Sequence, residues 1–153
     1  MSRRALTGVV VALGFAVAGC GASSAENTVF TRAANAVCSS TNDELGALAA
    51  PHALSGNHRN ALIAKLVARE IPIDDAEVRK LGSLSPPRGE RAAYTDAVAE
   101  ARADIAALPK IVAALRANDS AALNSVTQQS GALSDIAVAA MRRLNLRQCA
   151  RNL

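Results

Sequence analysis

Two long segments of the chain repeat small or apolar residues every three or four positions. In the segment from about 88 to 117, the repeating residues are Tyr94, Val98, Ala101, Ile105, Leu108, Val112 and Leu115. In the segment from about 120 to 144, they are Leu123, Val126, Ser130, Leu133, Ala137, Ala140 and Leu144. A mean repeat of about 3.5 residues places these side chains in one stripe along a helix, and it is typical of helices that pack along their length. The pattern therefore predicts two long, packed helices.

The first half of the chain adds two further predicted helices. One is expected from about 26 to 49, because the residue before Pro51 disfavours the helical conformation. The other is expected from about 58 to 70, where Pro72 should interrupt it, with Asp74 capping a short continuation through residue 84. Within the third helix, Pro109 should cause a kink or a break.

Composition favours the same fold class. Half of the 153 residues are hydrophobic, yet only 2% are aromatic and none is Trp. Frequent Ala suits helices, whereas scarce aromatic side chains argue against a stacking surface for nucleic acid. Because short connections favour antiparallel neighbours, we predict an all-α domain over residues 26–153. It should be an antiparallel four-helix bundle with a kinked third helix, and a less regular helical array is the alternative.

The first twenty residues carry an export pattern. Arg3 and Arg4 precede an uncharged stretch, 5–18, that has the length of a signal-peptide core and is too short to span a bilayer. The sequence Val17-Ala18-Gly19-Cys20 then resembles the lipobox of bacterial lipoproteins. The resemblance implies a cleaved signal peptide over 1–19, diacylglycerol on Cys20 and a tether over 20–25. The protein would then sit on the outer face of the cytoplasmic membrane, exported by the general or the twin-arginine route. The alternative is an ordinary helix with a chance cysteine.

Two cysteines remain if Cys20 carries lipid. Cys38 and Cys149 each stand alone, without the spacing of a redox or zinc motif. Export would place them in an oxidising compartment, so we predict a structural disulfide that ties the first helix to the C-terminal tail. Two buried free thiols are the alternative. In a bundle, either residues 146–148 fold back to reach Cys38 or the start of the first helix projects beyond the bundle.

Charge gives little information about partners. The whole chain has a formal net charge of +4, of which Arg3 and Arg4 would leave with the signal peptide. A basic C-terminal patch is formed by Arg142, Arg143, Arg147 and Arg151. Positive charge is favourable at a helix C-terminus, although contact with anionic headgroups is an alternative.

The residues suited to chemistry form no recognisable site. His52 and His58 could share a metal, but no third ligand is evident. The acidic pairs at 43–44 and 74–75 are better explained by caps and solvated faces, and Ser130 by close packing. We therefore expect no catalytic, metal-binding or cofactor-binding residues, and no enzymatic activity.

Several features together resemble small actinobacterial lipoproteins of uncharacterised activity. They are the lipobox at Cys20, a cysteine in the first helix, the stretch 81–87 and the ending 144–149. The resemblance implies an exported helical bundle with one disulfide. We expect a membrane-anchored interaction or accessory module, with another envelope protein as its partner. The alternative is a carrier or sensor of a small or apolar ligand. An exposed apolar patch would favour the first, and a large apolar cavity the second.

Overall fold

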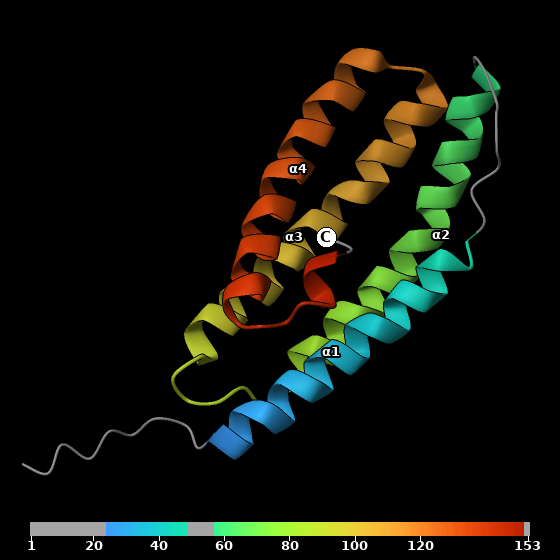
Figure 1. The fold of residues 1–153 in the computed structure, drawn as a ribbon. Helices are drawn as coiled ribbons and strands as arrows, with labels where there is room; N and C mark the ends of the chain where they lie inside the picture. Colours follow the sequence, from blue (N-terminus) through green and yellow to red (C-terminus); the bar gives the residue numbers. More distant parts are fainter. Residues whose placement is uncertain (1–23, 49–56, 152–153) are drawn as a thin grey trace, which may run out of the picture.

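The computed structural model describes residues 24–48 and 57–151, and this part of the chain is helical without any β-strand (Figure 1). Its elements are α1 (Ser24–Gly46), α2 (Asn57–Gly82), α3 (Arg91–Ala117), α4 (Ser120–Arg143) and the short 3₁₀ turn η1 (Cys149–Arg151). The predicted all-α class is confirmed. The predicted signal peptide, the lipidated Cys20 and most of the tether lie outside the described residues.

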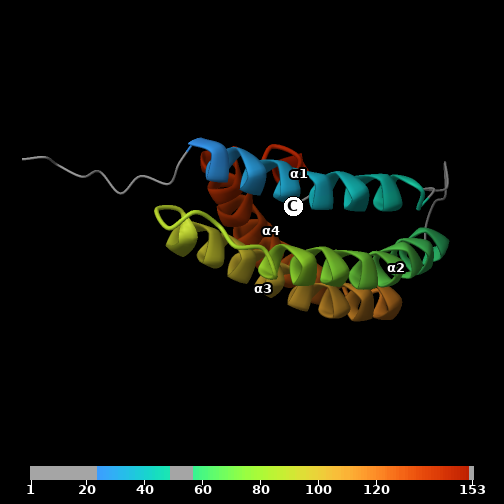
Figure 2. The ribbon, with the colours of Figure 1, turned by 90° about the horizontal axis from the view of Figure 1, so that it is seen from below.

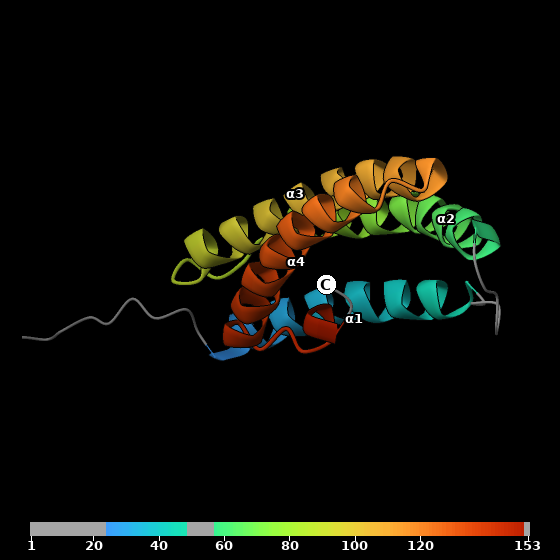
Figure 3. The same cartoon turned by 90° about the horizontal axis from the view of Figure 1, so that it is seen from above.

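Two of the four helices, α2 and α3, form a layer, and the other two, α1 and α4, are set against it (Figure 3). The chain doubles back after α2 and again after α3, so that α3 packs against both α2 and α4 (Figure 1). Figure 3 shows α2 and α3 as an arched layer, with α4 running from the far end of α3 toward the beginning of α1. Seen from the opposite side, α1 lies along α2 (Figure 2). Among the described residues, α1 and α4 are joined through the C-terminal tail and not by direct backbone packing.

Short polar side chains shape the turns at the two ends of α4. The side chain of Asp119 caps α4 by accepting a hydrogen bond from the Ala122 amide at 2.9 Å. Asn118 ends α3 in the left-handed conformation, with φ at 53°. Asn145 adopts the same conformation after α4, with φ at 57°.

The predicted interruption of the second helix is wrong. α2 continues from Asn57 to Gly82 with Pro72 inside it, so Asp74 caps no new helix. Proline removes one backbone hydrogen bond and crowds the preceding turn. The helix persists because it packs on α3 on both sides of Pro72. Ala64 belongs to a cluster with Val112 and Leu115 of α3, and Val78 and Leu81 to the main core.

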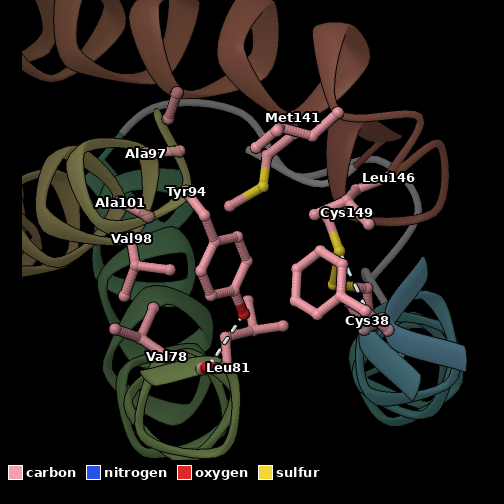
Figure 4. Packing of buried hydrophobic residues seen from close by; sticks show 14 of the residues in the cluster. Cys38, Val78, Leu81, Tyr94, Ala97, Val98, Ala101, Met141, Leu146 and Cys149 are labelled. Atoms are coloured by element: carbon pink, nitrogen blue, oxygen red, sulfur yellow. Dashed lines mark hydrogen bonds between the residues drawn. A yellow bond between two sulfur atoms is a disulfide. The ribbon is translucent and has the colours of Figure 1, made fainter. Parts of the chain in front are cut away.

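The main core lies where all four helices approach the disulfide (Figure 4). The α3 stripe is confirmed except at half-buried Leu108, and its buried residues are Tyr94, Val98, Ala101, Ile105, Val112 and Leu115. On α4 the predicted stripe is less well buried. Ala137 and Met141 have 0% exposure, although Met141 lies off the predicted stripe. Small side chains at Ala34, Ala97 and Ala137 allow the close approach, since each is at most 1% exposed.

The C-terminal tail folds back along α1, which decides between the two arrangements left open by the sequence. Cys149 forms the predicted disulfide with Cys38, and their Cα atoms are 4.9 Å apart. On the same face of α1, Asn35 accepts a hydrogen bond from the Gln148 amide at 2.9 Å. The side chain of Asn42 donates to the Gln148 carbonyl oxygen at 3.3 Å. Amide side chains on both sides of Cys38 along α1 thus hold the backbone of Gln148.

Candidate functional site

An open apolar groove lies between the beginning of α1 and the turn that leads into α3. We call it the N-terminal groove; its lining residues are Ala25, Glu26, Val29, Phe30, Ala33, Leu84, Ser85, Pro86, Pro87, Arg88 and Arg91. Its volume is about 850 Å³. Sites for small ligands range over about 300–1,000 Å³, so the groove has the size of a binding site.

The α1 wall of the groove combines an exposed and a buried apolar side chain. Val29 is 66% exposed, an unusual degree for a large apolar residue in this domain. The next residue, Phe30, is only 5% exposed, because its ring packs against Tyr94 of α3. The wall is therefore anchored in the core while it presents an apolar surface to solvent.

The opposite wall is a turn held by hydrogen bonds. The Tyr94 hydroxyl donates to the Leu81 carbonyl oxygen at 2.8 Å (Figure 4). Further along the turn, the Leu84 amide donates to the same carbonyl at 3.0 Å, and the Glu90 amide donates to the Pro87 carbonyl at 2.9 Å. Pro86 and Pro87 have fixed φ angles and no amide hydrogens. This wall is consequently preformed and mainly apolar.

Two arginines stand where the turn enters α3. Arg88 and Arg91 are both exposed and line the groove. Among the described residues, neither guanidinium has a hydrogen-bond or ion-pair partner. Glu26 is the acidic lining residue and belongs to the α1 wall. Glu90 is engaged elsewhere, because Asn27 donates to its Oε1 at 3.0 Å. The α3 end of the groove therefore offers free positive charge.

A second group of interest is a pair of carboxyl groups on the inner face of α2. Burial, followed by the charge of Asp74, raises the pKa of Glu77 to about 7, although a hydrogen bond with Thr41 partly offsets the rise. Burial also raises the pKa of Asp74 to about 6, with the charges of Glu70, Asp104 and Asp75 acting in the same direction. Glu77 is only 8% exposed. Both groups are thus poised to change protonation near neutral pH.

Glu77 also lies beside the disulfide. Its carboxyl oxygen and the sulfur atoms of Cys38 and Cys149 all fall within 4.8 Å of one another. The two sulfurs are bonded to each other, so neither is available as a thiolate ligand. The arrangement is a polar group buried against a disulfide, and it does not make a metal centre in this oxidised state.

The structure disperses the other candidates from the sequence. His58 is exposed at the beginning of α2, and His52 lies outside the described residues. The pair at 43–44 is exposed. Asp75 forms an exposed ion pair with Arg79 at 3.0 Å. Ser130 donates a hydrogen bond to Asp104, so it has a polar partner in addition to its packing position.

The basic C-terminal patch lies at the surface. Arg142, Arg143, Arg147 and Arg151 are all exposed, and Arg151 donates to the Gln148 side chain at 3.5 Å.

Sequence reasoning missed both the N-terminal groove and the burial of Glu77. A signal for the first was the apolar pair Val29-Phe30, because adjacent helical residues point in different directions and cannot both enter the same core face. A signal for the second was the position of Glu77 four residues before Leu81, which places it on the inner face of a continuous α2.

No known protein family, curated protein or solved structure matches this chain. In the described residues, no helix is both long enough and apolar enough to cross a membrane.

Proposed function

We propose that the protein is a lipid-anchored, non-catalytic module of the cell envelope that works by binding at the N-terminal groove. The observation that carries this proposal is the position of the groove at the end of the domain that follows Cys20. Its first lining residue, Ala25, is five residues after that cysteine. Five residues span at most about 18 Å. A lipid on Cys20 would hold the groove near the outer face of the cytoplasmic membrane.

The lining supports binding in preference to catalysis. Val29, Leu84 and Pro86 give the groove an apolar surface of the kind that docks a partner. The groups with raised pKa values, Asp74, Glu77 and Tyr94, are not among its lining residues. An interaction or accessory role is therefore favoured, with a partner in the envelope.

The size of the groove favours a second candidate function. A volume of about 850 Å³ is enough for a small or apolar ligand. In that case the protein would act as a carrier or sensor, with its ligand held between α1 and the α2–α3 turn and not along the centre of the bundle.

The proposal includes the finer description of the fold as an antiparallel four-helix bundle with a kinked α3. The reversal of the chain after α2 and α3 supports it (Figure 1). The position of Pro109 inside α3 supports a kink there, because proline removes one helical hydrogen bond.

The anchor is tested by Cys20→Ala in the full-length precursor, expressed in a bacterium that processes lipoproteins. The wild-type chain should begin at Cys20, carry the mass of a diacylglyceryl group and float with membranes. The variant should lose both properties. A wild-type chain that is exported with an unmodified Cys20 would contradict the proposal.

The groove is tested separately by photocrosslinking on intact cells. A photoreactive residue at Val29 should capture a reproducible partner. The same residue at Ile136, which is 51% exposed on α4, serves as the matched control and should not. Equal capture from both positions would argue against a specific role for the groove.

A further inference from the structure

We propose that the N-terminal groove binds an anionic phospholipid of the membrane, with an acyl chain along its apolar walls and the phosphate at Arg88 and Arg91. This inference rests on the proposed lipid anchor and names the ligand of the proposed binding site. It combines three observations: the apolar walls, the unpaired arginines and the short distance along the chain from Cys20.

The walls of the groove are suited to an acyl chain, because apolar side chains line both of them. Val29 and Ala33 face the groove from α1, while Leu84 and Pro86 line it from the turn. The exposure of Val29 leaves apolar surface in contact with water in the empty groove. An acyl chain laid between the walls would remove this surface from water, and each buried methylene group adds to the affinity.

The positive charge of the groove is suited to a phosphate group. Arg88 and Arg91 both line the groove where the turn enters α3, and neither is neutralised by a described residue. Guanidinium groups bind phosphate with paired, charge-assisted hydrogen bonds.

The position next to the tether decides between a lipid and a peptide. A tether of five residues would keep Ala25, the first lining residue of the groove, within about 18 Å of the anchored Cys20, near the phospholipid headgroups. The diacylglyceryl group on Cys20 has no phosphate and would leave both arginines unused. A membrane phospholipid supplies both an acyl chain for the apolar walls and a phosphate for the two arginines, whereas an apolar peptide supplies only apolar groups.

The test uses the absence of Trp from the chain. Val29→Trp places a single fluorescent reporter in the groove of the mature lipidated protein. The protein is reconstituted into vesicles of equal parts phosphatidylglycerol and phosphatidylcholine, in which only one of the two lipids carries brominated acyl chains. Ser85→Trp provides a second reporter on the opposite wall, in case the first variant loses its helical circular dichroism.

We expect the brominated anionic lipid to quench the groove reporter at least twofold more strongly than the brominated zwitterionic lipid. Arg88→Gln with Arg91→Gln should abolish this difference. Arg142→Gln with Arg143→Gln removes the same charge from exposed positions on α4 and should leave the difference intact. An Ile136→Trp reporter should show no preference between the lipids.

Equal quenching by both lipids would indicate simple proximity to the bilayer and overturn the proposal. Absence of quenching in vesicles that still carry the protein would also overturn it and leave the groove to a protein partner. Anchoring is read independently, from flotation and intact mass. Selective quenching without flotation would therefore contradict the proposed lipid anchor while supporting phospholipid binding.

Discussion

The rings of Phe30 and Tyr94 meet edge to face, with their centroids 4.9 Å apart. Phe30 belongs to α1 and Tyr94 to α3, and the Tyr94 hydroxyl reaches back to the Leu81 carbonyl of α2. One aromatic pair thus links three helices directly beneath the N-terminal groove. Burial raises the pKa of Tyr94 to about 12, so its hydroxyl remains a donor at physiological pH.

Tyr94→Phe should lower stability while it preserves the ring contact. The Leu81 carbonyl would lose the Tyr94 donor at a buried site, although it keeps the Leu84 amide. Loss of a buried hydrogen bond costs about 1 kcal/mol, and we expect that decrease in the free energy of unfolding by urea. Ser40→Ala removes an exposed hydroxyl and should change the free energy by less than about 0.5 kcal/mol. Equal effects of the two variants would show that the Tyr94 hydrogen bond adds little.

Ala137→Leu tests the close packing of α4. Ala137 has 0% exposure within the main core, so a larger side chain must displace its neighbours. Overpacking costs about 1–3 kcal/mol, which should appear as a lower melting temperature by circular dichroism. Ala139→Leu makes the same change at an exposed position of the same helix and should be nearly neutral. An Ala137→Leu variant with the melting temperature of the wild type would mean that the helices around residue 137 can move apart at little cost.

Much of the fold could be predicted because the chain is locally consistent. Regular apolar spacing located α3 and α4, and Asp119 and Asn145 marked their ends with side-chain and backbone chemistry that acts within a few residues. Pro72 was misleading for the same reason. Its local effect is to break a helix, and the packing of α2 on α3, which overrides it, is not visible in the local sequence.

The candidate site was much harder to predict. The N-terminal groove is lined by residues from segments 25–33 and 84–91, and neither segment contains a motif that predicts contact with the other. Glu77 resembles a surface residue in the sequence, and it becomes buried only when α1 and the tail cover α2. Both features depend on tertiary placement, whereas the disulfide could be predicted from the number of cysteines and from the predicted export of the chain.

Removing the disulfide by Cys38→Ser with Cys149→Ser should destabilise the protein without abolishing its helices. The bridge joins positions separated by 111 residues and thereby restricts the unfolded chain. Loss of a native disulfide typically costs about 2–5 kcal/mol, so the urea midpoint should fall clearly. Helical circular dichroism should persist, because α3 packs on both α2 and α4 without the bridge.

Ser39→Ala is a control for the disulfide variant, next to Cys38 on α1. Alkylation followed by mass spectrometry checks the oxidation state directly. Two modified thiols at Cys38 and Cys149 in the native exported protein would contradict the assigned bond.

Glu77 should make the stability of the protein depend on pH. The pKa of Glu77 is raised from its ordinary value of 4.5 to about 7 in the folded state, mainly by burial. The folded protein therefore holds this proton more tightly than the unfolded chain. The protonated Glu77 carboxyl group therefore stabilises the folded state fully below about pH 4.5, and this stabilisation is lost as the pH rises through about 7. Asp74 acts in the same direction with its pKa raised to about 6, so both groups favour the folded state under mildly acidic conditions.

Glu77→Gln should remove the larger part of this dependence, because glutamine keeps the shape of the protonated acid and carries no charge. One pKa unit corresponds to about 1.4 kcal/mol, so the variant should exceed the wild type at pH 8 by about 3 kcal/mol in free energy of unfolding. At pH 4.5 the two proteins should be nearly equal. Urea titrations at intervals between these pH values measure the difference, with exposed Glu44→Gln as the matched control. A constant difference across the whole range would show that Glu77 is ionised in the folded protein, with the Thr41 hydrogen bond outweighing its burial.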